Sequence, residues 1–126
     1  MAESKTQADI KDIESDMSNP IEVAIYKHYS PNTQAQDLMW TNYFRTELVA
    51  QGEADVEQKV VGMVLAVQGG KSVDEALSGI DDDKKEAYKK LVKVGIRTAW
   101  AKACITEGLT AMAESREPNY PPFPAV

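Results

Sequence analysis

The sequence predicts an all-α protein, a single-domain bundle of four or five helices with extended N- and C-terminal arms. Three observations predict it. Apolar residues recur at spacings of three and four through most of the chain, the pattern of amphipathic helices. Asn-Pro and Ser-Pro pairs, a capping box and paired glycines divide it into helix-length segments. With 126 residues, 43% of them hydrophobic, the chain is long enough for one modest core.

The first 18 residues are predicted to be an acidic arm outside the helical domain. Its three regularly spaced apolar residues are too few to hold a solitary helix, which is marginal in water. The helical domain is expected to span residues 19–117. It starts at Asn19-Pro20, because asparagine is a good N-cap and the missing N–H of proline is harmless at the first helical position.

A second helix is predicted from Pro31 to Gln51, with Gly52 placed where a C′ glycine ends a helix. This helix carries an aromatic group made up of Trp40, Tyr43 and Phe44. At helical spacing these rings are expected to form the heart of the core. The alternative is that they line a ligand pocket.

A third helix is predicted over residues 53–68, opening with acids at the positive end of its dipole. From Val60 to Val67 it is apolar nearly all round, which predicts burial on several sides. The valines also allow a strand, but the acidic first turn favours a helix. Gly62 inside this run indicates close approach of another backbone, since glycine weakens a helix interior.

A capping box, Ser72 to Glu75, predicts a short fourth helix. A long fifth helix is predicted over residues 80–115, in which Gly95 and Gly108 leave open a bend or a split. The predicted core combines helices two, three and five through Trp40, Phe44, Val60, Val64, Leu91 and Trp100.

Charge is distributed unevenly along a chain whose net charge is −6. Residues 1–83 hold 6 basic and 16 acidic residues, whereas residues 84–126 hold 8 basic and 4 acidic. The predicted long helix carries a basic stripe at four-residue spacing, Lys85, Lys89, Lys93 and Arg97. Like charges at that spacing repel weakly, so an acidic counterpart is favoured.

The counterpart of the basic stripe has three candidates: the chain's own acids, an acidic face of a neighbouring copy, or nucleic acid phosphate. The sequence pI of about 4.8 favours protein over nucleic acid, because nucleic-acid-binding domains are usually net basic. A plain solvated face is the alternative to any partner.

Residues 118–126 form a Pro/aromatic tail that cannot be helical and is expected to be extended. Tyr120 and Phe123 are its candidate anchors for a groove on a partner, because a stiff segment loses little entropy when it docks. The alternative is a frayed terminus.

No residue pattern predicts a catalytic site, a cofactor or a metal. His28 is the single histidine and has no second ligand at metal-binding spacing. Cys104 lies among alanines in a predicted helix, where a packing role is favoured over a nucleophile. The run Asp81-Asp82-Asp83 lacks the spacing of a calcium loop and is interpreted as a helix cap. The sequence therefore predicts a protein that is not an enzyme.

The predicted function is a non-enzymatic structural or scaffold subunit that self-associates or docks into a larger assembly, of which a virion component is one example. Its expected partners are copies of itself or another protein, bound through Lys85, Lys89, Lys93, Arg97, Tyr120 and Phe123. The alternatives are a nucleic-acid-associated protein and an accessory subunit or small-ligand binder using a Trp40 cavity.

The expected location is the cytoplasm, or a particle assembled there, with no membrane association. The N-terminal stretch lacks the basic and apolar regions of a secretory signal, and the longest apolar run is too short to cross a bilayer. The single cysteine fits a reducing compartment.

Overall fold

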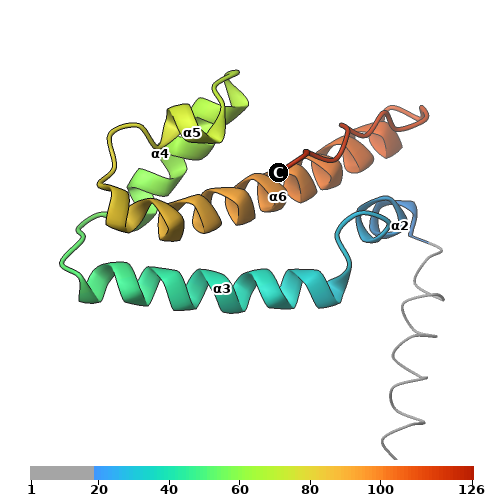
Figure 1. The fold of residues 1–126 in the computed structure, drawn as a ribbon. Coiled ribbons are helices and arrows are strands. Elements are labelled where there is room, and N and C mark those ends of the chain that lie inside the picture. The colour runs from blue at the N-terminus through green and yellow to red at the C-terminus, as the bar shows by residue number, and fades with distance from the viewer. Residues whose placement is uncertain (1–18) are drawn as a thin grey trace, which may run out of the picture. The chain divides into compact units, whose positions relative to one another are not determined.

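The computed structural model describes residues 19–126, so the predicted acidic arm, residues 1–18, lies outside the described part of the chain. Residues 19–126 contain five helices and no strand, which confirms the predicted all-α class (Figure 1). The helices are α2 (Pro20–Tyr26), α3 (Pro31–Ala50), α4 (Val56–Gln68), α5 (Val73–Ala76) and α6 (Asp82–Ala113). The segment after residue 116 is extended, as expected for the C-terminal arm.

Several helix ends were correctly predicted from their capping residues. The side chain of Asn19 accepts a hydrogen bond from the backbone N–H of Ile21 at 3.0 Å and caps α2. The capping box of α5 forms as predicted, with Ser72 and Glu75 each accepting a backbone N–H of the other. Gly52 adopts a φ of +88° just beyond α3, a conformation that glycine adopts without strain.

The described residues form two compact units. The first unit combines residues 19–30 with 101–122, and the second combines residues 31–100 with 123–126. α6 contributes residues to both units. The predicted limits of the helical domain, residues 19 and 117, stay a prediction.

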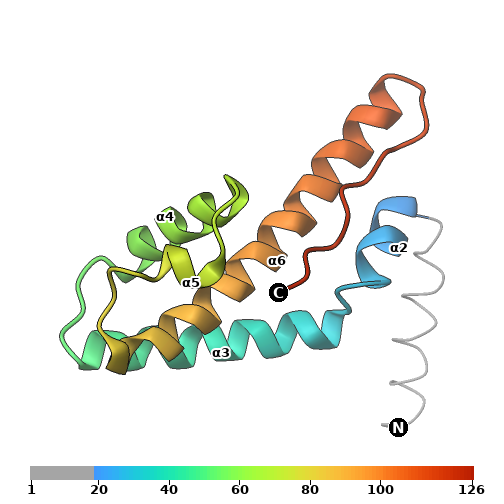
Figure 2. The same cartoon turned by 45° about the horizontal axis from the view of Figure 1, so that its top comes forward.

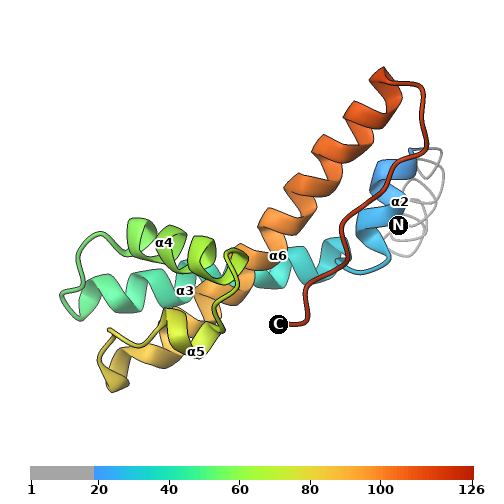
Figure 3. The same ribbon diagram turned by 90° about the horizontal axis from the view of Figure 1, so that it is seen from above.

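The second unit holds the larger core. α4 and α5 contact each other and lie against the first half of α6 (Figure 3), and α3 runs alongside the same half (Figure 1). The core comprises Leu48, Val56, Met63, Leu77, Tyr88, Leu91, Val92 and Ile96. α6 passes α4 closely at Gly95, where an added Cβ would lie 2.8 Å from Val64 Cγ2.

The first unit packs α2 and the extended tail against the second half of α6. Ile21 and Ile25 are the buried residues of α2. An added Cβ on Gly108 would collide with the Ile21 side chain, so α2 meets α6 at this glycine. Figure 2 shows the tail turning back beside the last turns of α6. α6 is unbroken at both Gly95 and Gly108, and these glycines give room to neighbouring side chains instead of splitting the helix.

The turn that reverses the chain after α6 contains a residue in the left-handed region. Ser115 has a φ of +53°, its N–H bonds the Met112 carbonyl at 3.2 Å, and the Arg116 N–H bonds the Ala111 carbonyl at 2.9 Å. This is the hydrogen-bond pattern of a Schellman motif, with serine at the position where glycine is usual. The motif ends α6 and starts the tail.

Three predictions about the core are wrong. The run from Val60 to Val67 is not buried on several sides, because Val61 and Leu65 are 58% and 61% exposed. Trp40 is 47% exposed and Tyr43 is 51% exposed, so the aromatic group is not the heart of the core. Its third member, Phe44, is half-buried and packs against the core of the second unit. An added Cβ on Gly62 would meet nothing within 4 Å, so no backbone approaches there. Of the other predicted core residues, Leu91 and Trp100 are buried. Val60 and Val64 are partly buried and pack against the core.

Gly62 and Gly95 provide a matched test of these packing assignments. Gly62→Ala is expected to raise the free energy of unfolding by up to about 1 kcal/mol, because alanine favours the helix and its methyl group has open space. Gly95→Ala is expected to lower it, because the new methyl group would push against Val64. Urea denaturation of the two variants measures both changes, and changes of the same sign would contradict the assignment.

Candidate functional site

Five large apolar side chains of α3 lie exposed, and we call this surface the outer face. It comprises Leu38, Met39, Trp40, Tyr43 and Val49. Met39 is 64% exposed. Because an α-helix turns by 100° per residue, Met39 lies between Leu38 on one side of the face and the two rings on the other. Isolated exposed apolar residues are ordinary, but several large ones on one helix make a candidate interaction surface.

The aromatic rings of α3 contact one another at the border between the outer face and the core. Trp40 stacks on Phe44 with ring centroids 5.5 Å apart and planes at 24°. Tyr43 meets both rings edge-on, at centroid distances of 6.0 Å from Trp40 and 5.0 Å from Phe44. Because Phe44 packs against the core, these contacts restrict the two exposed rings and present them as a preformed surface.

The rotation of α3 that exposes these rings is set by an ion pair between Asp37 and Arg97 of α6. The guanidinium donates from Nε to Asp37 Oδ2 at 2.8 Å and from Nη2 to Oδ1 at 3.0 Å, a bidentate pair. Asp37 is only 6% exposed. Thr41, Phe44 and Leu48 follow Asp37 at helical spacing and share its inward side, so the opposite side of α3 is left to solvent.

The outer face carries few charges, and α3 has no exposed charged residue before Tyr43. α3 contains three charged residues, Asp37, Arg45 and Glu47. Asp37 is buried, and Arg45 forms an ion pair with Glu57 of α4. The exposed polar neighbours of the rings are Asn32, Thr33, Gln36, Asn42, Thr46 and the acid Glu47, which lies one helical turn beyond Tyr43. Aromatic and methionine side chains with few charges are the composition of the centre of a protein–protein interface.

Two further helices leave apolar side chains exposed. On α4 these are Val61 and Leu65, one helical turn apart. On the second half of α6 they are Ile105, Leu109 and Met112. Each group lacks the large rings of α3, but together they show that apolar surface is exposed in both units.

The predicted basic stripe lies along α6, and half of it is paired within the chain. Lys85 forms an ion pair with Asp82 at 3.2 Å, and Arg97 pairs with Asp37 as described above. Among residues 19–126, Lys89 and Lys93 have no ion pair with a carboxylate. The prediction that the stripe needs an acidic counterpart is thus met inside the chain for Lys85 and Arg97, whereas binding of the stripe to a partner stays a prediction.

The two predicted tail anchors are engaged with their own chain. Phe123 packs edge-on against Trp100, with centroids 4.9 Å apart and planes at 87°. The Tyr120 hydroxyl would lie 3.3 Å from a Cβ on Gly108 and has no hydrogen-bond partner among the described residues. Burial raises the pKa of this hydroxyl. Both side chains are half-buried, and their binding to a partner stays a prediction.

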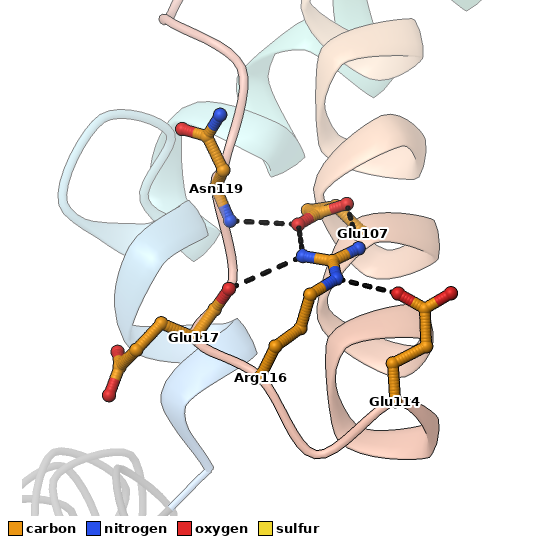
Figure 4. A network of polar contacts seen from close by, with 5 residues as sticks. All are labelled: Glu107, Glu114, Arg116, Glu117 and Asn119. Atoms are coloured by element: carbon orange, nitrogen blue, oxygen red, sulfur yellow. Dashed lines mark hydrogen bonds and ion pairs between the residues drawn. The ribbon is translucent and has the colours of Figure 1, made fainter.

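A polar clasp holds the reversed tail against α6 (Figure 4). Arg116 donates two hydrogen bonds to Glu107, from Nη1 at 2.6 Å and from Nη2 at 3.2 Å. The backbone N–H of Asn119 donates a third to Glu107 at 2.8 Å, and Arg116 Nε reaches Glu114 at 2.6 Å. The Arg116 hydrogen bonds, followed by that of Asn119, lower the pKa of Glu107 to about 2.

A second carboxylate cluster lies in the second unit, at the start of α6. Glu53 accepts hydrogen bonds from the Tyr88 hydroxyl at 2.6 Å, from Lys59 at 3.0 Å and from Lys84 at 3.1 Å. These bonds, that of Tyr88 first, lower the pKa of Glu53 to about 2. Burial, together with the hydrogen bond to Glu53, raises the pKa of Tyr88. Both clusters join segments of the fold, and we assign them a structural role.

The remaining candidates for chemistry lie apart from these clusters. Cys104 is fully buried, as predicted for a packing residue, and its burial raises the pKa of the thiol. His28 lies exposed in the turn after α2. Among residues 19–126 no three histidine, cysteine or acidic side chains lie close enough to hold a metal ion, and no helix there is long and apolar enough to cross a membrane.

Comparisons with known proteins gave no match: no protein-family model fits the chain, and no curated protein or solved structure is similar to it. The functional argument for this chain consequently depends on its own surface.

The lowered pKa values of Glu53 and Glu107 predict destabilisation by acid. Both carboxyls titrate near their ordinary pKa in the unfolded chain and at about 2 in the folded one. Their contribution to stability is therefore present above about pH 4.5 and lost as the pH falls toward 2. The melting temperature of Glu53→Gln should lie below that of the wild type at pH 7, and the difference should shrink on acidification.

The control for this titration is Glu86→Gln, a change at an exposed position of α6 that has no ion pair among the described residues. Its difference in melting temperature from the wild type should stay constant over the same pH range. A Glu53→Gln difference that is as constant as the Glu86→Gln difference would contradict the assignment.

The unpaired hydroxyl of Tyr120 predicts an unusual response to its removal. Tyr120→Phe is expected to raise the free energy of unfolding by about 1 kcal/mol, because a buried donor without a partner loses its bonds to water without compensation. Tyr88→Phe is the matched control and should lower it, because that hydroxyl bonds Glu53. Urea unfolding measures both, and destabilisation by Tyr120→Phe would show that its hydroxyl has a partner.

Proposed function

We propose that this protein is a non-enzymatic structural subunit that self-associates and contributes to a larger protein assembly. The observation that carries the proposal is the exposed group of large apolar side chains on α3, which includes the rings of Trp40 and Tyr43. Burying such side chains in a partner releases free energy, at roughly 25 cal/mol per Å² of apolar surface removed from water. Because contacts to the core already restrict the rings, little of that free energy is lost to ordering them on association.

The charge arrangement supports self-association over nucleic-acid binding. Lys85 and Arg97 already have carboxylate partners in the chain, so the stripe offers phosphate two of its four predicted cations. The net charge of −6 also opposes the approach of a polyanion. An acidic protein with an apolar face that carries few charges is better suited to meet another protein.

The geometry gives less support to a small-ligand binder. The predicted Trp40 cavity would require that ring to point inward, whereas nearly half of its surface is accessible. A shallow hollow lies between α3 and the start of α4, lined by Arg45, Val49, Asp55, Val56, Glu57 and Gln58. Its charged rim and open form do not enclose a ligand as binding pockets usually do.

The test of this function is the mass of the purified chain in solution. Multi-angle light scattering from about 1 to about 100 µM should give a mass above the 13.9 kDa of one chain, rising with concentration. The mass should change little between low and high salt, because apolar contacts are not screened. A mass of 13.9 kDa at every concentration would show that the chain does not self-associate.

A further inference from the structure

We propose that the outer face of α3 pairs with the outer face of a second copy, so that the two α3 helices pack on each other about a two-fold axis. The inference rests on the proposed function, self-association, and it names the surface and the partner. It excludes the exposed groups on α4 and α6 as the primary contact.

The low charge of the outer face favours a second copy as its partner. Two copies of a chain with a net charge of −6 repel each other over most of their surfaces. At the outer face this repulsion is reduced, because Asp37 is buried in its ion pair and Arg45 is paired with Glu57, which leaves Glu47 as the exposed acid of α3. A face with few charges also offers a highly charged partner little electrostatic attraction, so it favours a surface like itself.

The types of side chain on the outer face suit a two-fold contact. In such a contact the same patch is used twice, so it has to be self-complementary. Trp40 and Tyr43 can meet the same rings or Met39 of the partner, and both contacts are favourable for aromatic and thioether groups. The one exposed acid on this side of α3, Glu47, lies beyond the rings toward the C-terminal end of the helix.

The area of the outer face is sufficient for a specific dimer. About half of each of its five side chains is accessible, and a large side chain presents on the order of 200 Å². Covering the face on both copies would remove on the order of 1,000 Å² from water, the lower bound expected for a biological interface. The groups on α4 and α6 have two and three members, so each of them alone falls below this bound.

Charged substitutions on the outer face are the decisive test. Met39→Glu/Tyr43→Glu should raise the dissociation constant of the dimer at least about 100-fold, because four like charges would be forced together. Both side chains are exposed in the single chain, so the fold should be retained, which circular dichroism checks. The matched controls are Val61→Glu/Leu65→Glu on α4 and Leu109→Glu on α6, which should leave dissociation unchanged.

Mixing oppositely charged variants tests whether the face meets itself. Met39→Lys/Tyr43→Lys should be as monomeric as the glutamate variant, and an equimolar mixture of the two should associate again. Restored association would support face-to-face pairing, since opposite charges then lie across the axis. If the mixture stays monomeric while the unchanged chain associates, the face does not meet itself and the inference is overturned.

The controls separate failure of the inference from failure of the proposed function. If the unchanged chain associates and only the α4 or α6 control dissociates it, self-association stands and the α3 assignment is wrong. If the unchanged chain is monomeric at every concentration, the proposed function itself is wrong.

Discussion

The bidentate ion pair between Asp37 and Arg97 is the interaction on which the arrangement of the second unit depends. α3 has apolar residues on all sides, so burial alone would stabilise several of its rotations about its own axis. A buried carboxylate without a partner is costly, and removing one member of such a pair typically destabilises a protein by about 3–5 kcal/mol. Only the rotation that faces Asp37 toward α6 satisfies both charges. That rotation turns Leu48 inward and leaves Trp40 outside.

The same ion pair explains why an apolar face is available for association. It takes charge away from the surface of α3 while it fixes which apolar residues are buried. The rings that remain outside are held by Phe44, whose side chain packs against the core. A partner would therefore meet a rigid surface with few charges, and little side-chain entropy would be lost on binding. The Asp37–Arg97 ion pair thus both stabilises the subunit and leaves the apolar face exposed.

Local signals in the sequence predicted the helices well, because caps and breaks act within a few residues. Asn19, the capping box at Ser72 and Gly52 each ended or started a helix where expected. The rotation of α3 was not predictable from periodicity, since its apolar residues do not select one side. Its one available signal was Asp37, an acid in register with Phe44 and Leu48. Gly62 and Gly95 were indistinguishable by sequence, because only the neighbouring helix decides which of them is crowded.

The predicted partner-binding residues illustrate a general limit of counting charges and rings along a chain. Lys85, Arg97, Tyr120 and Phe123 were prominent in the sequence, yet each is engaged inside its own unit. A charge or ring is available to a partner only if the fold has no internal use for it. By that criterion the outer face of α3 is better placed to bind than the tail or the paired half of the stripe. Its residues are large and exposed, and no other segment within residues 19–126 covers them.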